Sequence, residues 1–136
     1  MTDKELICLA KKAAENAYVP YSHYTVGAAL LTKDGRVYTG CNIENAAYGP
    51  TNCAERTAFF KAVSEGEREF SKIAVVGGKE LNFADYFAPC GVCRQVMSEF
   101  AGGDFKIILD GKGEPEVYTL DELMPLRFDK TNLGEV

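Results

Sequence analysis

Residues 53–56 (CAER) and 89–94 (PCGVCR) decide the fold, because they place cysteines at the starts of two expected helices. The first stretch is followed by apolar residues at helical spacing up to residue 63, and Pro89 heads the second helix, where proline is favoured. Two adjacent helices that begin in this way can point three sulfur atoms at one position. The rest of the chain must therefore form a core that holds these two helices side by side.

The remaining pattern supplies a sheet for these helices to cover. A first helix is expected to start at a capping box of Thr2 and Glu5 and to stop before Pro20. Strands are expected at residues 26–31, 36–41, 73–76, 105–109 and 117–119, and further helices at 53–64, from 89 to about 102, and at 120–124. The first two strands form a hairpin, and helical crossovers favour parallel pairing of the later ones. We expect an α/β fold of three α/β/α layers, with a mixed sheet of about five strands and a single domain over residues 1–136.

Composition and charge narrow the functional classes. The chain has 136 residues, of which 46% are hydrophobic and 26% charged, as is typical of a soluble globular domain. The formal net charge is -5 and no basic cluster is present, which argues against a nucleic-acid partner. No segment has the pattern of a signal peptide or a membrane span, so we expect a cytoplasmic protein without a membrane partner.

Three of the five cysteines predict a metal centre. Cys53, Cys90 and Cys93 could bind one zinc ion per chain, and three protein ligands with an open fourth position are typical of a catalytic zinc site. Glu55, near the open position but not bound to the metal, would carry protons between water and substrate. Three thiolates give the zinc site a formal charge of about -1. We expect Arg56 and the two helix N-termini to offset that charge.

Simpler interpretations of these residues remain open. Cys90 and Cys93 alone have the spacing of a redox pair, although that leaves Cys53 and Glu55 without a role. Asn52 followed by Glu55 also has the spacing of a helix cap, in which the carboxylate has no catalytic part. Cys8 is expected to be a small buried residue of the first helix and not a ligand.

The chain resembles the cytidine deaminases, and in particular their small branch that assembles as a homotetramer. The likeness covers almost the whole chain and is carried by residues 21–24, 26–30, 40–46, 53–58 and 89–95. It includes a cysteine and glutamate pair followed by Pro-Cys-x-x-Cys, the signature of zinc deaminases. The resemblance implies a three-layer deaminase fold and the hydrolysis of cytidine and deoxycytidine to uridine and deoxyuridine plus ammonia, in pyrimidine salvage.

The resemblance also implies roles for residues outside the cysteine motifs. Asn42 and Glu44 would bind the ribose hydroxyls. Tyr24 would line the base pocket, and the backbone of Ala54 would contact the base. Three more would reach in from neighbouring subunits: Ala46, Tyr48 and Phe128. The chain departs from the family where Tyr24 replaces the usual phenylalanine, and in residues 79–88, which match no known pattern. This stretch, with Phe83, Tyr86 and Phe87, either covers the zinc end of the site or simply packs against the core.

Three other functions stay open at this point. A related branch of deaminases acts on other aminated heterocycles, including an antibiotic nucleoside, although Asn42 and Glu44 suit an unmodified ribose. A polynucleotide deaminase would need a basic channel, which this acidic chain lacks. A structural zinc module would have four protein ligands, and a redox protein would bind no metal.

Overall fold

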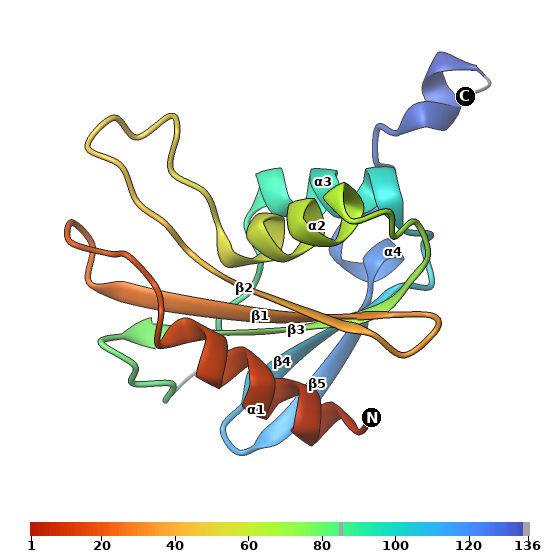
Figure 1. Cartoon of the computed structure of the whole chain (residues 1–136). Helices are drawn as coiled ribbons and strands as arrows, with labels where there is room; N and C mark the ends of the chain where they lie inside the picture. Colours follow the sequence, from red (N-terminus) through yellow and green to blue (C-terminus); the bar gives the residue numbers. More distant parts are fainter. Residues whose placement is uncertain (85, 135–136) are drawn as a thin grey trace.

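A five-stranded sheet in the order β2-β1-β3-β4-β5 forms the middle layer of the computed structural model, which describes residues 1–84 and 86–134. The strands are β1 (Tyr24–Thr32), β2 (Val37–Cys41), β3 (Phe70–Lys79), β4 (Lys106–Gly111) and β5 (Glu114–Thr119). Helix α1 (Asp3–Ala14) covers one face, and α2 (Ala54–Ser64) and α3 (Gly91–Phe100) cover the other (Figure 1). The three-layer α/β/α fold with a mixed sheet is confirmed.

The pairing of the strands explains why the sheet is mixed. β1 is antiparallel to both β2 and β3, β3 is parallel to β4, and β4 is antiparallel to β5. Between β2 and β3 the chain crosses over through α2. Because β3 pairs with β1 and not with β2, this crossover joins strands that are not neighbours. The parallel pairing expected from helical crossovers is therefore found between β3 and β4, on either side of α3.

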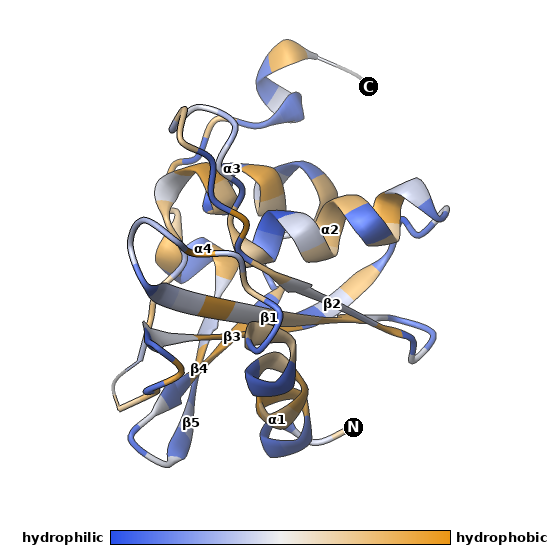
Figure 2. Ribbon diagram, turned by 60° about the vertical axis from the view of Figure 1, so that its left-hand side comes forward, coloured by the Kyte–Doolittle hydropathy of each residue, from blue (hydrophilic) through white to orange (hydrophobic). Residues whose placement is uncertain are grey.

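Helix α1 begins as predicted but ends earlier than Pro20 suggests. The Thr2 hydroxyl accepts a hydrogen bond from the Glu5 amide at 3.1 Å, and the Glu5 carboxylate accepts one from the Thr2 amide at 2.9 Å. The helix ends at Ala14, and the Tyr18 amide then donates to the Asn42 carbonyl at 3.0 Å, so the chain leaves the helix to pair beside β2. Polar and apolar residues alternate along α1 (Figure 2), and Cys8 lies on its exposed side, so the expectation that Cys8 is buried is wrong.

Aromatic packing fixes the layer that carries the two cysteine stretches. Phe59 of α2 is fully buried, and its ring lies 5.1 Å from that of Phe70, 6.1 Å from that of Phe100 and 5.9 Å from that of Phe105. Gly40 of β2 lies so close to α2 that an added Cβ would be 2.5 Å from the Ala54 carbonyl oxygen. The first turn of α2 is thereby held directly against the sheet.

The end of the chain contains elements that the sequence only partly predicted. The short α4 (Leu120–Leu123) follows β5, and a 3-10 helix η1 (Lys130–Leu133) lies in a tail that extends beyond the layer of α2 and α3 (Figure 1). Neither the tail's direction nor η1 was expected. Within the described residues, no helix combines the length and the apolar character that a membrane crossing requires.

Candidate active site

Three sulfur atoms converge where α2 and α3 begin. Cys53 is the N-cap of α2, Cys90 is the N-cap of α3, and Cys93 lies in the first turn of α3 with 1% of its surface exposed. Their Sγ atoms all lie within 4.8 Å of one another. The helix starts therefore bring together the residues that the spacing singled out.

The geometry of the sulfur atoms fits a zinc ion. The Sγ atoms of Cys53 and Cys90 are 3.7 Å apart. Two sulfurs bound at ~2.3 Å to one tetrahedral zinc ion lie roughly 3.8 Å apart, whereas a disulfide needs about 2.05 Å. Among residues 1–84 and 86–134, no fourth cysteine, histidine or carboxylate joins the group. The donor set thus suits one zinc ion with an open fourth position.

Glu55 lies one residue into α2 and is 3% exposed. Its Oε1 atom is buried and has no hydrogen-bond partner among the described residues. Burial raises the pKa of this carboxyl to about 7. The alternative that Asn52 and Glu55 merely cap the helix is wrong: Cys53 is the N-cap, and the Asn52 side chain donates to the Thr57 hydroxyl at 3.1 Å.

A pocket of about 240 Å³ opens over these groups. Cys53, Cys90 and Glu55 line it together with Tyr24 and Asn42. A second pocket of about 330 Å³ adjoins it, because Ser22 and Thr51 line both, and it is bordered by Glu44 and Tyr48. The two pockets thus share part of their wall, and Cys53 and Cys90 line one of them while Glu44 lines the other.

Comparison with known proteins identifies this arrangement. Residues 1–109 match the family described as "Cytidine and deoxycytidylate deaminase zinc-binding region". The chain belongs to this deaminase family. It is 53% identical to the cytidine deaminase of Sporosarcina psychrophila over 98% of its own length and 96% of that protein. It is 32% identical to the blasticidin-S deaminase of Bacillus cereus, over 94% and 93% of the two chains.

Solved structures show the same fold. A crystal structure of cytidine deaminase from Burkholderia pseudomallei superposes on the deaminase with a TM-score of 0.86, at 49% identity over 94% of this chain and all of that one. The corresponding enzyme of Mycobacterium tuberculosis gives a TM-score of 0.80 at 41% identity, over 94% and 98% of the two chains. The zinc-dependent character of the family agrees with the three-sulfur cluster described above.

The two polar residues after β2 hold the deaminase's pocket in shape. The Asn42 side chain accepts from the Val26 amide at 2.9 Å and donates to the Tyr24 carbonyl at 2.8 Å. One carboxylate oxygen of Glu44 accepts from the amides of Tyr21 and Ser22, at 3.0 and 3.1 Å. Partial burial raises the pKa of Glu44, but hydrogen bonds from Ser22 and Tyr21 outweigh this effect and lower that pKa. Glu44 is thus kept ionised as a hydrogen-bond acceptor.

Phe87 is a pocket residue of the stretch 79–88, for which the sequence left open whether it covers the zinc end of the site or simply packs. It lines the same pocket as Glu55, and its ring centroid is 6.4 Å from that of Tyr24. Two aromatic rings therefore border the space beside the sulfur cluster. The available signal was an aromatic residue just before Pro89, in the stretch 79–88 that matched no pattern; Asp85 of that stretch lies outside the described residues.

The other predicted residues lie in several places. Ala54 is fully buried at the start of α2, beside the ligand Cys53, and Tyr48 borders the second pocket. Ala46 and Phe128 line neither pocket of their own chain. Their expected role, at the site of a neighbouring subunit, stays a prediction.

Arg56 is placed to offset the charge of the thiolates. Its Nη2 atom donates to Cys53 Sγ at 3.2 Å. Hydrogen bonds from Cys93, Arg56 and Cys90 lower the pKa of the Cys53 thiol to about 5. A guanidinium and two helix N-termini therefore stabilise the thiolate of Cys53, whereas the hydrogen bond to that thiolate and burial raise the pKa of the neighbouring Cys93 thiol.

We expect Arg56→Ala to weaken zinc binding by about 10- to 100-fold, as is common when a group that supports a metal ligand is lost. Competition with a chromophoric chelator measures the affinity. Arg56→Gln keeps hydrogen-bond donors and removes only the charge, so it separates the two contributions. Arg36→Ala, which removes an exposed arginine paired with Asp34 and Glu67, is the control. Equal affinities for Arg56→Ala and the control would contradict the prediction.

Proposed function

We propose that this deaminase hydrolyses cytidine and deoxycytidine to uridine and deoxyuridine, with release of ammonia, as a step of pyrimidine salvage. The observation that carries the proposal is the buried Oε1 of Glu55, which has no hydrogen-bond partner among residues 1–84 and 86–134, in a glutamate that lines the same pocket as Cys53 and Cys90 of the three-sulfur cluster. Relatives and structural neighbours named as cytidine deaminases support this choice of substrate.

The chemistry divides between the metal and Glu55. A zinc ion held by Cys53, Cys90 and Cys93 would act as a Lewis acid that makes a water molecule more acidic. Glu55 would take the two protons of the attacking water one after the other, passing the first to the ring nitrogen and the second to the departing amino group. The water oxygen becomes the new carbonyl oxygen, and the carbon–nitrogen bond breaks to give ammonia. Because Oε1 has no hydrogen-bond partner in the part of the chain that the structure describes, it is free to hold the moving proton.

The remaining pocket residues would position the nucleoside. Tyr24 packs beside the base, and the backbone of Ala54 contacts its polar edge. Asn42 and Glu44 would hydrogen-bond the ribose hydroxyls, because Glu44 is an ionised acceptor in the adjoining pocket. Phe87 would border the base pocket together with Tyr24. A nucleoside thus extends from the sulfur cluster toward Glu44.

The active site is proposed to be completed by a homotetramer. Tyr48 and Phe128 are large apolar residues with 82% and 60% of their surfaces exposed, and Ala46 is exposed beside Tyr48. Exposed aromatic residues of this kind are typical of contact surfaces. In this proposal they close the pocket of a neighbouring copy, and residues 1–136 form one cytoplasmic domain per subunit.

An ultraviolet assay tests the proposed reaction. Addition of cytidine to the purified protein is expected to give the absorbance change of conversion to uridine, and prior removal of zinc by a chelator is expected to abolish it. Restored activity after zinc is added back separates metal loss from unfolding. Absence of conversion by protein that holds one zinc ion per chain would overturn the proposal.

Competition experiments distinguish the other substrates. The similarity to blasticidin-S deaminase makes an aminated nucleoside other than cytidine the second candidate. Asn42 and Glu44 favour an unmodified ribose, so cytidine is expected to have the higher kcat/KM. Single-stranded DNA is expected not to compete, since the chain has a formal net charge of -5. Strong inhibition by single-stranded DNA would favour a polynucleotide substrate.

A further inference from the structure

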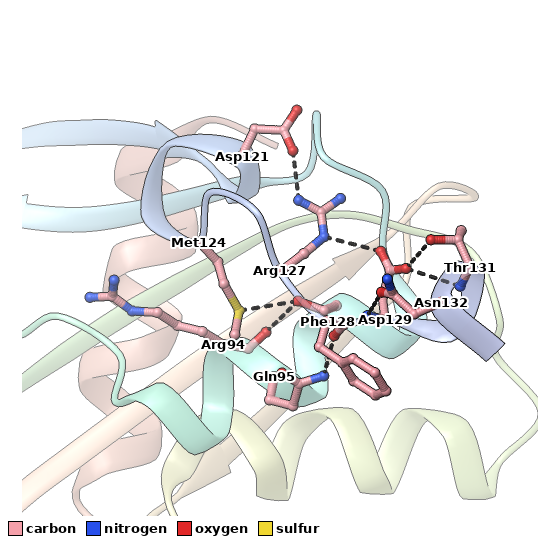
Figure 3. A network of polar contacts seen from close by, with 10 residues as sticks. Arg94, Gln95, Asp121, Met124, Arg127, Phe128, Asp129, Thr131 and Asn132 are labelled. Carbon is pink, nitrogen blue, oxygen red and sulfur yellow. Dashed lines mark hydrogen bonds and ion pairs between the residues drawn. The ribbon is translucent and has the colours of Figure 1, made fainter.

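We propose that Arg127 is a positioning residue that clamps the C-terminal tail and so presents Phe128 to the substrate pocket of a second copy of this chain. The inference rests on the proposed function, in which Phe128 completes a neighbour's site. Arg127 Nη1 lies 2.6 Å from Asp121 Oδ1, and Arg127 Nε lies 3.5 Å from Asp129 Oδ2 (Figure 3). One guanidinium therefore joins α4 to the residue that follows Phe128.

The clamp is partly shielded from water. The side chains of Arg127 and Asp129 are 16% and 18% exposed, whereas that of Asp121 is 71% exposed. Ion pairs at fully exposed positions contribute little, because water screens them and long side chains lose entropy. Arg127 donates a hydrogen bond from Nη1 to Asp121, whereas its buried Nε has no hydrogen-bond partner among the described residues and faces Asp129 only as an ion pair at 3.5 Å. Arg127 is thus suited to fix the direction of the backbone around it.

Asp121 is itself held in place. Its amide donates to the Gly103 carbonyl at 3.0 Å. Its carboxylate lies directly over Gly103, where an added Cβ would be 2.3 Å from both carboxylate oxygens. The absence of a side chain at Gly103 therefore gives Asp121 the space in which it meets Arg127.

A second set of hydrogen bonds ties the C-terminal tail to α3, the helix that has Cys90 and Cys93 at its start. Gln95, two residues after Cys93, donates from Nε2 to the Phe128 carbonyl at 2.7 Å (Figure 3). Arg94 donates from Nη1 to the Leu123 carbonyl at 2.6 Å and from Nε to the Pro89 carbonyl at 2.9 Å. The backbone of Phe128 is therefore anchored to α3, while its side chain stays exposed.

The backbone before Arg127 has an unfavourable conformation that needs such support. Leu126 has a φ of 51°, in the left-handed region that residues with a Cβ rarely adopt, and its side chain is fully exposed. Strained residues of this kind persist where surrounding contacts hold them. The clamp at Arg127 and the Gln95 bond are contacts of that kind directly after it.

A fixed tail lowers the cost of forming the shared site. An aromatic residue that is already held in its contact position loses less conformational freedom on binding than one on a loose tail. Removal of the clamp should therefore weaken nucleoside binding and leave the proton chemistry at Glu55 unchanged. The expected signature is a raised KM with an unchanged kcat.

Hydrogen exchange tests the clamp without reference to catalysis. In Arg127→Ala, amides of residues 127–133 are expected to exchange about tenfold faster or more, because the tail opens locally. Arg127→Lys keeps a charge for one carboxylate and should restore part of the protection. Arg36→Ala removes an exposed arginine that also has two carboxylate partners and is the control. Unchanged tail exchange in Arg127→Ala would overturn the proposal, whatever the substrate.

A double-mutant cycle tests the link to Phe128. Arg127→Ala alone is expected to raise KM for cytidine by about threefold to tenfold and to change kcat by less than about twofold. The reason is that the loosened tail then loses its conformational freedom when the nucleoside binds. In a Phe128→Ala background the same change should alter KM by less than about twofold. An equal effect in both backgrounds would show that Arg127 acts independently and would overturn the proposal. No effect of Phe128→Ala itself would instead contradict the proposed function of Phe128, while hydrogen exchange still decides the clamp.

Discussion

Replacement of Glu55 by glutamine is expected to reduce kcat for cytidine by about 10³- to 10⁴-fold, the upper part of the range for loss of a general acid and base. Glutamine has nearly the same shape as glutamate, but it cannot accept the proton from water or pass it on. The zinc content should stay at one ion per chain, because the three sulfur atoms form the metal site without Glu55. Steady-state kinetics and metal analysis on the same preparation measure both.

The fold should tolerate this substitution well. Glu55 is 3% exposed and burial raises its pKa to about 7, so its ionised form is costly to bury. A neutral amide carries a smaller desolvation cost, and we expect Tm to be unchanged or raised. Glu65→Gln, at the exposed end of the same helix, is the matched control and should keep wild-type turnover. Turnover within tenfold of wild type for Glu55→Gln would mean that another group carries the proton.

Replacement of Cys93 by serine is expected to lower the zinc content to below about 0.1 ion per chain and to abolish measurable turnover. A serine hydroxyl does not ionise near neutral pH and is a poor zinc ligand. Because zinc binds the folded chain and not the unfolded one, Tm should also fall. Atomic absorption, the cytidine assay and thermal unfolding measure the three effects.

Two companion variants separate metal loss from a packing defect. Cys93 is 1% exposed within the core, whereas Cys90 is exposed at the helix start, so Cys90→Ser should lose zinc without disturbing the core. Cys8→Ser changes an exposed thiol on α1, outside the sulfur cluster, and should keep full zinc and turnover. Retention of one zinc ion per chain by both Cys93→Ser and Cys90→Ser would contradict the three-ligand site.

Local patterns made much of the fold predictable. The capping box at Thr2 and Glu5, the hairpin of the first two strands and the apolar runs of the strands depend on neighbouring residues, and the elements expected there are present. The pairing of β3 with β1, and the end of α1 at Ala14, depend on contacts between distant segments. Such contacts leave no period in the sequence, which explains why these details were missed.

The candidate site likewise combines local features of the sequence with contacts between distant segments. Cysteines at two helix starts and a glutamate two residues after the first cysteine are local features. They predicted the donor set, whose three sulfur atoms the structure brings together, and a proton carrier, whose role stays a prediction. The pairing of Phe87 with Tyr24 depends on a loop folding over the sheet. The clamp of Arg127 depends on α4, the tail and Gly103 meeting in space. Neither of these two contacts can be predicted from the spacing of residues in the sequence.

By itself, the sequence determined which chemical groups are available: three thiols that suit a metal, one carboxylate proposed to transfer protons and polar groups proposed to bind a ribose. Residue type and helical spacing are sufficient for this, because a helix start orients its first side chains in a regular way. The tertiary structure decided which of these groups share a pocket, how completely Glu55 is removed from water, and how the tail is aimed. Burial and the meeting of distant side chains come from packing the whole core, so no local stretch contains them.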